Sequence, residues 1–187
     1  MRQNSWLIGV LALVLLVGGS VWYMNRTSVA PSVEEGNVLY TNPTYNISFQ
    51  YPDRYELRER EVGTQERYHY SVTLIDKEAF PEIPQNGEGP PVIAVDVFQN
   101  DLDTLLIEQW VHGTNDSNFK LSPDDALTST TVAGAPALSY TWDGLYRGKS
   151  VVLSHRDSII VLSVQWLTEE DAIIKDFADL LTSLELN

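Results

Sequence analysis

Two hydrophobic patterns divide the chain. Residues 6–24 (WLIGVLALVLLVGGSVWYM) form a run of 19 residues without a charge, whereas from residue 37 onward apolar and polar positions alternate or recur at helical spacing. At about 1.5 Å per residue the run spans roughly 28 Å, close to the thickness of a bilayer's hydrocarbon core. It predicts a transmembrane anchor over residues 1–24, with Trp6, Trp22 and Tyr23 at the membrane interfaces.

A cleaved signal peptide is the alternative for this segment, because Val17 and Gly19, or Gly18 and Ser20, are small residues before a cleavage position. The run is longer than a usual signal-peptide core, which favours retention as a signal-anchor. Arg2 and the amino terminus favour an N-terminus inside the cell. We therefore expect a single-pass protein of the cell membrane, with residues 25–36 as a flexible linker and residues 37–187 outside the cytoplasm.

The first half of the remaining chain has the pattern of strands followed by a helix. Residues 39–57 alternate, with Tyr45, Ile47, Phe49 and Tyr51 on one face until Pro52. Residues 65–75 and 91–99 also predict strands, and the proline-rich segment 76–91 between them predicts an exposed loop. Residues 101–113 predict a helix that Asp101 or Asp103 caps, with an apolar stripe of Leu102, Leu105, Leu106 and Trp110.

The second half repeats this order. Four strands at hairpin spacing are predicted between residues 127 and 167, with turns at Ala133-Gly134 and Arg156-Asp157. The last helix is predicted to begin at Thr168, with Asp171 completing a variant of the capping box. Its apolar stripe consists of Ile173, Phe177, Leu180, Leu181 and Leu184.

Four strands, a helix, four strands and a helix, joined by short connections, indicate an α+β domain with a mainly antiparallel sheet. Residues 158–167 are apolar at Ile159, Ile160, Val161, Leu162 and Val164, so both faces of this strand must be covered. The prediction is therefore a three-layer α/β/α arrangement around a central sheet.

Composition narrows the classes of function. The chain has no cysteine, which excludes disulfides, thiolate metal sites and cysteine nucleophiles. Its 12 Lys and Arg face 26 Asp and Glu, for a net charge of −14. Such a surface repels phosphate backbones, so nucleic acid is not expected as a partner.

Several segments carry a resemblance to a known family. They are the strand that ends in Tyr-Pro (ISFQYPDRYEL), the turn before the meander (VAGAPALSYTWD), the strand that ends in SVQW, and the closing helix that runs into Leu-Thr-Ser-Leu-Glu-Leu. Over residues 38–187 the chain resembles bacterial PsbP-related proteins of the Mog1/PsbP-like fold that carry an N-terminal anchor. The resemblance implies the three-layer fold and a non-enzymatic accessory or binding role. It implies no site residue, because no functional motif of that family can be placed on this sequence.

No catalytic constellation is present, and no enzyme activity or cofactor is predicted. The chain lacks G-x-S-x-G and G-x-G-x-x-G, and His69, His112 and His155 lie on different expected elements without a ligand partner at short spacing. Asp101 with Asp103, and Asp124 with Asp125, lack the Gly and terminal Glu of a calcium loop, so capping and solvation explain them better.

Asp96 is the exception to the pattern, because it places a charge on an apolar strand face with Val92, Ala94 and Phe98. Two hypotheses follow. In the first, the domain is an interaction module for an envelope protein, with contact surfaces in the loop 76–91 and in the turn from Trp142 to Tyr146. In the second, it is a cation- or ligand-binding sensor that uses acidic loops near Asp96. The candidate contact residues are therefore Asp96, Trp142 and Tyr146.

Overall fold

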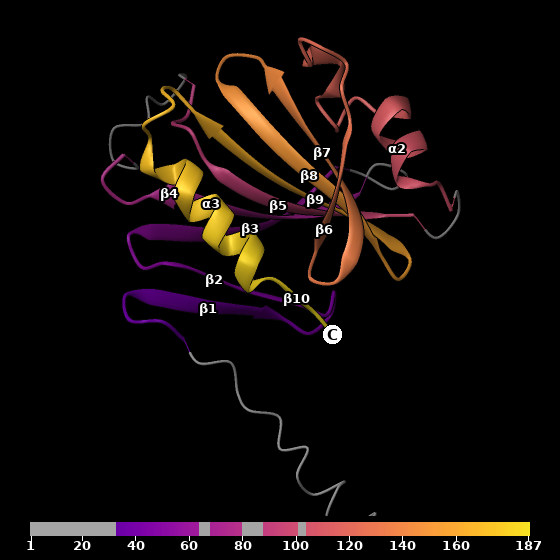
Figure 1. Cartoon of the computed structure of the whole chain (residues 1–187). Helices are drawn as coiled ribbons and strands as arrows, with labels where there is room; N and C mark the ends of the chain where they lie inside the picture. Colours follow the sequence, from indigo (N-terminus) through magenta and orange to yellow (C-terminus); the bar gives the residue numbers. More distant parts are fainter. Residues whose placement is uncertain (1–32, 64–67, 80–87, 101–103) are drawn as a thin grey trace, which may run out of the picture. The chain divides into compact units, whose positions relative to one another are not determined.

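Seven antiparallel strands form the central sheet of the part that the structure describes (Figure 1). The structure is a computed structural model that describes residues 33–63, 68–79, 88–100 and 104–187, and Val33–Asn187 is one compact unit. From edge to edge the strands are β3 (Tyr55–Val62), β4 (His69–Asp76), β5 (Ile93–Gln99), β9 (Ser158–Trp166), β8 (Arg147–His155), β7 (Ala135–Asp143) and β6 (Thr128–Val132).

A smaller antiparallel sheet and two helices complete the described fold. The small sheet has the order β1 (Asn37–Asn42), β2 (Ile47–Pro52) and β10 (Glu185–Leu186). The helices are α2 (Ile107–Gly113) and α3 (Ala172–Ser183), and a 3-10 turn, η3, covers Phe119–Leu121. This composition confirms the predicted α+β class with a mainly antiparallel sheet.

The large sheet is covered on both faces, and each face has its own hydrophobic core. One core joins the sheet to α3 and the small sheet through buried residues such as Phe49, Leu162 and Phe177. The other joins it to α2 and η3 through Trp110, Phe119, Tyr140, Trp142, Val152, Ile159 and Val161. The helices therefore lie in separate layers on either side of the sheet.

Strand β9 shows why its sequence is apolar at consecutive positions. Successive side chains of a strand point to opposite faces. Accordingly, Ile159 and Val161 enter the core beneath α2, whereas Ile160 and Leu162 enter the core beneath α3. The prediction that this strand is covered on both sides is confirmed.

The described residues contain one more strand before the first helix than the sequence pattern predicted. A turn separates β1 from β2, with Asn46 in the left-handed region at φ 56°. The Asn42 side chain holds this turn, because its Oδ1 accepts the N–H groups of Thr44 (3.0 Å) and Tyr45 (3.2 Å). Ile47, Phe49 and Tyr51 share the buried face as predicted.

Helix α2 begins later than predicted, at Ile107. Thr104 has φ 46°, and the Asn100 side chain bonds both backbone groups of Leu105 at 3.0 Å, which holds this segment outside a helix. Trp110 is buried as expected, but Leu106 is exposed, so its assignment to the buried stripe was wrong. Residues 101–103, with both predicted caps, lie outside the described residues.

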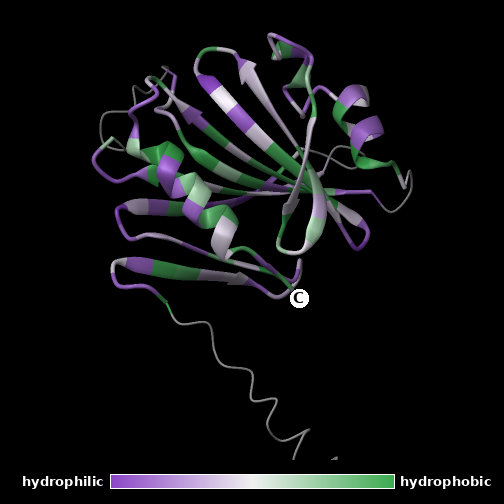
Figure 2. Cartoon of the chain, viewed as in Figure 1, coloured by the Kyte–Doolittle hydropathy of each residue, from purple (hydrophilic) through white to green (hydrophobic). Residues whose placement is uncertain are grey.

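Helix α3 confirms its predicted stripe, since Ile173, Phe177, Leu180 and Leu184 are buried. Hydrophobic and hydrophilic residues alternate along this helix in Figure 2. The predicted cap at Thr168 was wrong. The helix begins after Asp171, whose carboxylate accepts the N–H of Leu167 at 2.8 Å and the hydroxyl of Thr168 at 2.7 Å.

Candidate functional site

The turn between β7 and β8 brings four segments of the chain together. Gly144 lies against Leu121 of η3, since a Cβ at this glycine would stand 3.5 Å from the leucine Cδ1. The Tyr146 hydroxyl donates a hydrogen bond of 2.8 Å to the carbonyl of Gly89. Arg147 Nη1 is 3.0 Å from Glu169 Oε1 in the connection between β9 and α3. We call residues 144–146, together with Leu121, Gly89 and residues 167–169, the hairpin end.

Trp142 anchors this turn from below. It is the cross-strand partner of Gly148, and its six-membered ring lies so close over that glycine that a Cβ would stand 2.2 Å from it. Its indole N–H donates a hydrogen bond of 3.0 Å to the Ser150 hydroxyl. The side chain is only 5% exposed, so Trp142 supports the surface and is not the contact residue that the sequence suggested.

A second tryptophan fixes the end of β9. Trp166 is the partner of Arg147 across the β8–β9 pair, and its indole N–H donates a 3.3 Å hydrogen bond to Glu169. A hollow of about 300 Å³ lies at this end, lined by Pro123, Thr141, Trp142, Asp143, Arg147, Gly148, Trp166 and Glu169. Two buried indoles and an ion pair thus hold the strand ends in position.

Three large apolar side chains are exposed on this frame. Leu121 is 46% exposed, Leu145 61% and Leu167 67%. They come from η3, from the β7–β8 turn and from the segment after β9, so they are distant in sequence but belong to one end of the fold. A contiguous apolar patch in water is typical of a contact surface, whereas single exposed apolar side chains are common.

The charge around these leucines is mainly negative. Asp143, Glu170 and Asp171 flank the hairpin end, and Glu169 within it is paired with Arg147. Residues 33–187 carry 10 Lys and Arg against 26 Asp and Glu, a net charge of −16. A matching surface would therefore combine apolar and basic groups.

Asp96 lies away from the hairpin end, on the face of the large sheet that also carries α2. Its carboxylate is 3.7 Å from His69 Nε2, and its side chain is 20% exposed. Burial raises the pKa of the Asp96 carboxyl above its usual value, while the Ser71 hydroxyl and His69 act in the opposite direction. The half-buried carboxylate thus lies beside a histidine on an inner strand of the large sheet.

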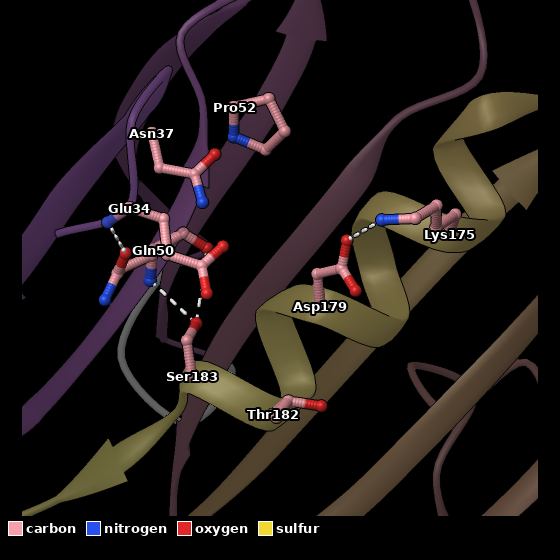
Figure 3. Close-up of a pocket in the computed structure, with 8 residues that line it drawn as sticks. All are labelled: Glu34, Asn37, Gln50, Pro52, Lys175, Asp179, Thr182 and Ser183. Carbon is pink, nitrogen blue, oxygen red and sulfur yellow. Dashed lines mark hydrogen bonds and ion pairs between the residues drawn. The ribbon is translucent and has the colours of Figure 1, made fainter.

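A polar hollow of about 340 Å³ separates β2 from α3 (Figure 3). Gln50 donates its N–H to the Ser183 hydroxyl at 2.9 Å, and its side-chain oxygen accepts the N–H of Glu34 at 3.0 Å. Lys175 and Asp179 pair with each other along the helix. These polar groups form hydrogen bonds and an ion pair with one another, so we assign the hollow to the packing of the small sheet against α3.

Other candidate residues stay without a structural description. Trp6, Trp22 and Tyr23 lie outside the described residues, as does the middle of the loop, residues 80–87. In the described ranges no helix is long and apolar enough to cross a bilayer. Within those same ranges no three His, Asp or Glu side chains gather as a metal site would require.

The sequence pointed to Tyr146 and to the adjoining loop as candidates, but not to the three leucines. A leucine in the turn Asp143-Gly144-Leu145-Tyr146 was a usable signal, because turns are mostly polar. Gly148 was another, since a glycine inside a strand often marks a close approach. Nothing local connects Leu121 or Leu167 with this turn.

Comparison with known proteins supports the fold. No family model and no curated protein matches the sequence. The solution structure of cyanobacterial PsbP (CyanoP) from Synechocystis sp. PCC 6803 is similar, with a TM-score of 0.56 and 11% identity over 87% of this chain and 99% of that chain. The chain therefore has a PsbP-like α+β fold, as its sequence resemblance implied.

A crystal structure from Bacteroides thetaiotaomicron VPI-5482 is also similar, at a TM-score of 0.47 and 11% identity. That similarity covers 82% of this chain and 49% of the other.

Proposed function

We propose that this protein is a non-enzymatic accessory module, tethered to the cell membrane by residues 1–24, whose folded domain binds an envelope protein outside the cytoplasm. The observation that supports this most is the hairpin end, where Leu121, Leu145 and Leu167 stay exposed on a frame of buried tryptophans and hydrogen bonds. The uncharged run of residues 6–24 supports the tether.

The chemistry of the partner follows from the site. Exposed leucines offer burial worth about 25 cal/mol per Å² of apolar surface, which supplies affinity. The acidic residues around them favour a partner that carries Lys or Arg beside its apolar contact, because complementary charge speeds and orients association. The rigid strands beneath mean that little order has to be gained on binding.

Site-specific photocrosslinking tests this proposal. A photoreactive residue at position 145 or 167 of the full chain should crosslink one and the same membrane or envelope protein in the host. The matched control is position 106, also an exposed leucine but one that precedes α2. With the photoreactive residue at position 167, Leu145→Asp should remove the product. Equal crosslinking from position 106, or a product that survives Leu145→Asp, would refute the hairpin end as the contact surface.

A second candidate function is cation or ligand binding near Asp96. The half-buried carboxylate beside His69 favours it, because carboxylate and imidazole are both metal ligands. Calorimetric titration with calcium, manganese and zinc distinguishes the two functions. Micromolar binding that is lost in Asp96→Asn would favour the second, whereas an unchanged partner product in that variant would favour the first.

A further inference from the structure

The two outer strands of the large sheet differ sharply in charge. β3 at one edge has charged side chains at five of its eight positions, namely Glu56, Arg58, Glu59, Arg60 and Glu61. β6 at the other edge (Figure 1) has none. Residues 126–142, which form the β6–β7 hairpin up to the residue before Asp143, lack a charge in a chain with 26 acidic residues. Charges on an edge strand block pairing with another strand, so β3 is protected and β6 is not.

β6 is also exposed to solvent on both faces of the sheet. Residues 128–131 are all exposed, although their side chains alternate between the two faces of the sheet, and only Val132 is buried. No other part of the described chain pairs with its outer edge. A further strand could therefore lie beside β6 without displacing anything that the structure describes.

The turn after β6 determines which backbone groups point outward. Ala133 (φ 51°) and Gly134 (φ 76°) form the two-residue turn of a tight hairpin, which is closed by a hydrogen-bonded pair of Val132 and Ala135. The next pair, Thr131 and Pro136, is then a non-hydrogen-bonded one, which suits a proline that has no N–H. By the same alternation Ser129 and Thr131 direct their N–H and C=O groups to the open edge.

We propose that β6 pairs antiparallel with β6 of a second copy of this chain, about a two-fold axis at Thr130. Outward groups must meet outward groups, so Ser129 of each copy bonds with Thr131 of the other. A two-fold axis at Ser129 would pair Thr131 with Leu127, and an axis at Thr131 would pair Ser129 with Ala133. Leu127 and Ala133 both lie outside β6, so these registers are less favourable. Opposed Thr and Ser side chains are favourable cross-strand pairs, and a two-fold contact closes on itself.

The edge at β6 is better suited to pair with a second copy than the edge at β1, the other uncharged outer strand. β1 already uses the N–H of Asn37, which donates to the carbonyl of Glu34 at 3.0 Å, and its Tyr40 is buried in the core. Two copies that each carry −16 over residues 33–187 repel each other. They can approach where neither presents a charge, and residues 126–142 of the β6–β7 hairpin are such a place.

Cysteine crosslinking tests the register, because the native chain has no cysteine. In the proposed dimer the two Thr130 residues form a non-hydrogen-bonded pair with Cα atoms about 4.5 Å apart, within the range for a disulfide. Thr130→Cys in the full chain in detergent micelles should give, on mild oxidation, a band at twice the 21.0 kDa mass of the chain. Ser129→Cys or Thr131→Cys alone should not, but a mixture of these two variants should.

Two controls complete the test. Thr41→Cys, on the β1 edge, measures accidental collision, and the double change Ser129→Glu and Thr131→Glu places like charges opposite each other and should abolish the Thr130→Cys product. Mixing that double variant with Ser129→Lys and Thr131→Lys, each in the Thr130→Cys background, should restore the product. A Thr130→Cys yield no greater than that of Thr41→Cys, or one that the glutamates leave unchanged, would overturn the proposal.

Discussion

Replacing Gly148 with alanine tests the frame of the hairpin end most directly. An alanine Cβ would stand 2.2, 2.3 and 2.6 Å from three atoms of the Trp142 ring, whereas carbon atoms in contact are ordinarily about 3.5–4.0 Å apart. The ring must therefore move by more than about 1 Å to reach an ordinary van der Waals distance from the new Cβ. The displaced indole N–H would also lose its hydrogen bond of 3.0 Å to the Ser150 hydroxyl.

The expected cost combines two effects. Overpacking of a core site costs about 1–3 kcal/mol, and the lost hydrogen bond adds about 0.5–1.5 kcal/mol. Gly148→Ala should then lower the free energy of unfolding by about 1.5–4.5 kcal/mol, a large share of the usual 5–15 kcal/mol. Without the indole, alanine in place of glycine would be neutral or slightly stabilising.

Urea unfolding of residues 33–187, followed by far-ultraviolet circular dichroism, measures this loss. Gly144→Ala is the matched control, because its Cβ would meet its neighbours at 3.5 Å or more. In a Trp142→Leu background the penalty of Gly148→Ala should fall below about 0.5 kcal/mol. If Gly148→Ala costs no more than Gly144→Ala, or costs the same with and without the indole, the packing argument is wrong.

Three further predictions concern the core, the half-buried charge and the anchor. Phe177→Ala should cost about 3–5 kcal/mol, because a buried aromatic on α3 is lost; a melting temperature within a degree or two of the parent would show that the helix is peripheral. The raised pKa of Asp96 means that protonation favours the folded state, so stability should gain from this group as pH falls through its folded pKa, and Asp96→Asn should remove that gain in urea titrations across pH. Leu13→Arg should impair membrane insertion by a few kcal/mol, about 2.5–3.5 on insertion scales, and unchanged recovery in membrane fractions would count against a spanning helix.

The β8–β9 pair and α3 show what local patterns can predict. Helical spacing placed Ile173, Phe177 and Leu180 on one buried stripe, and consecutive apolar residues in β9 required a cover on both faces. Both inferences depend on side-chain periodicity, which the backbone imposes within a few residues. The turn residues Ala133 and Gly134 were likewise visible, because their conformation is local.

The ends of helices and strands were harder to predict from the sequence. The start of α2 depends on the Asn100 side chain, which bonds both backbone groups of Leu105 and competes with a helical turn. The β1–β2 turn depends similarly on the Asn42 side chain. Such side-chain bonds to the backbone decide where elements begin, and periodicity does not reveal them.

The sequence by itself determined the fold class, the covering of β9 on both faces and the acidic surface. It also determined the two candidate contact segments, which are the loop 76–91 and the turn from Trp142 to Tyr146. Only the tertiary structure decided that Leu121, Leu145 and Leu167 belong to one end, that Trp142 is buried over Gly148, and that Asp96 meets His69. The physical reason is that these relations join residues far apart in the chain. They depend on strand order and on the register between strands, and a shift of one residue in register turns every side chain of a strand to the opposite face.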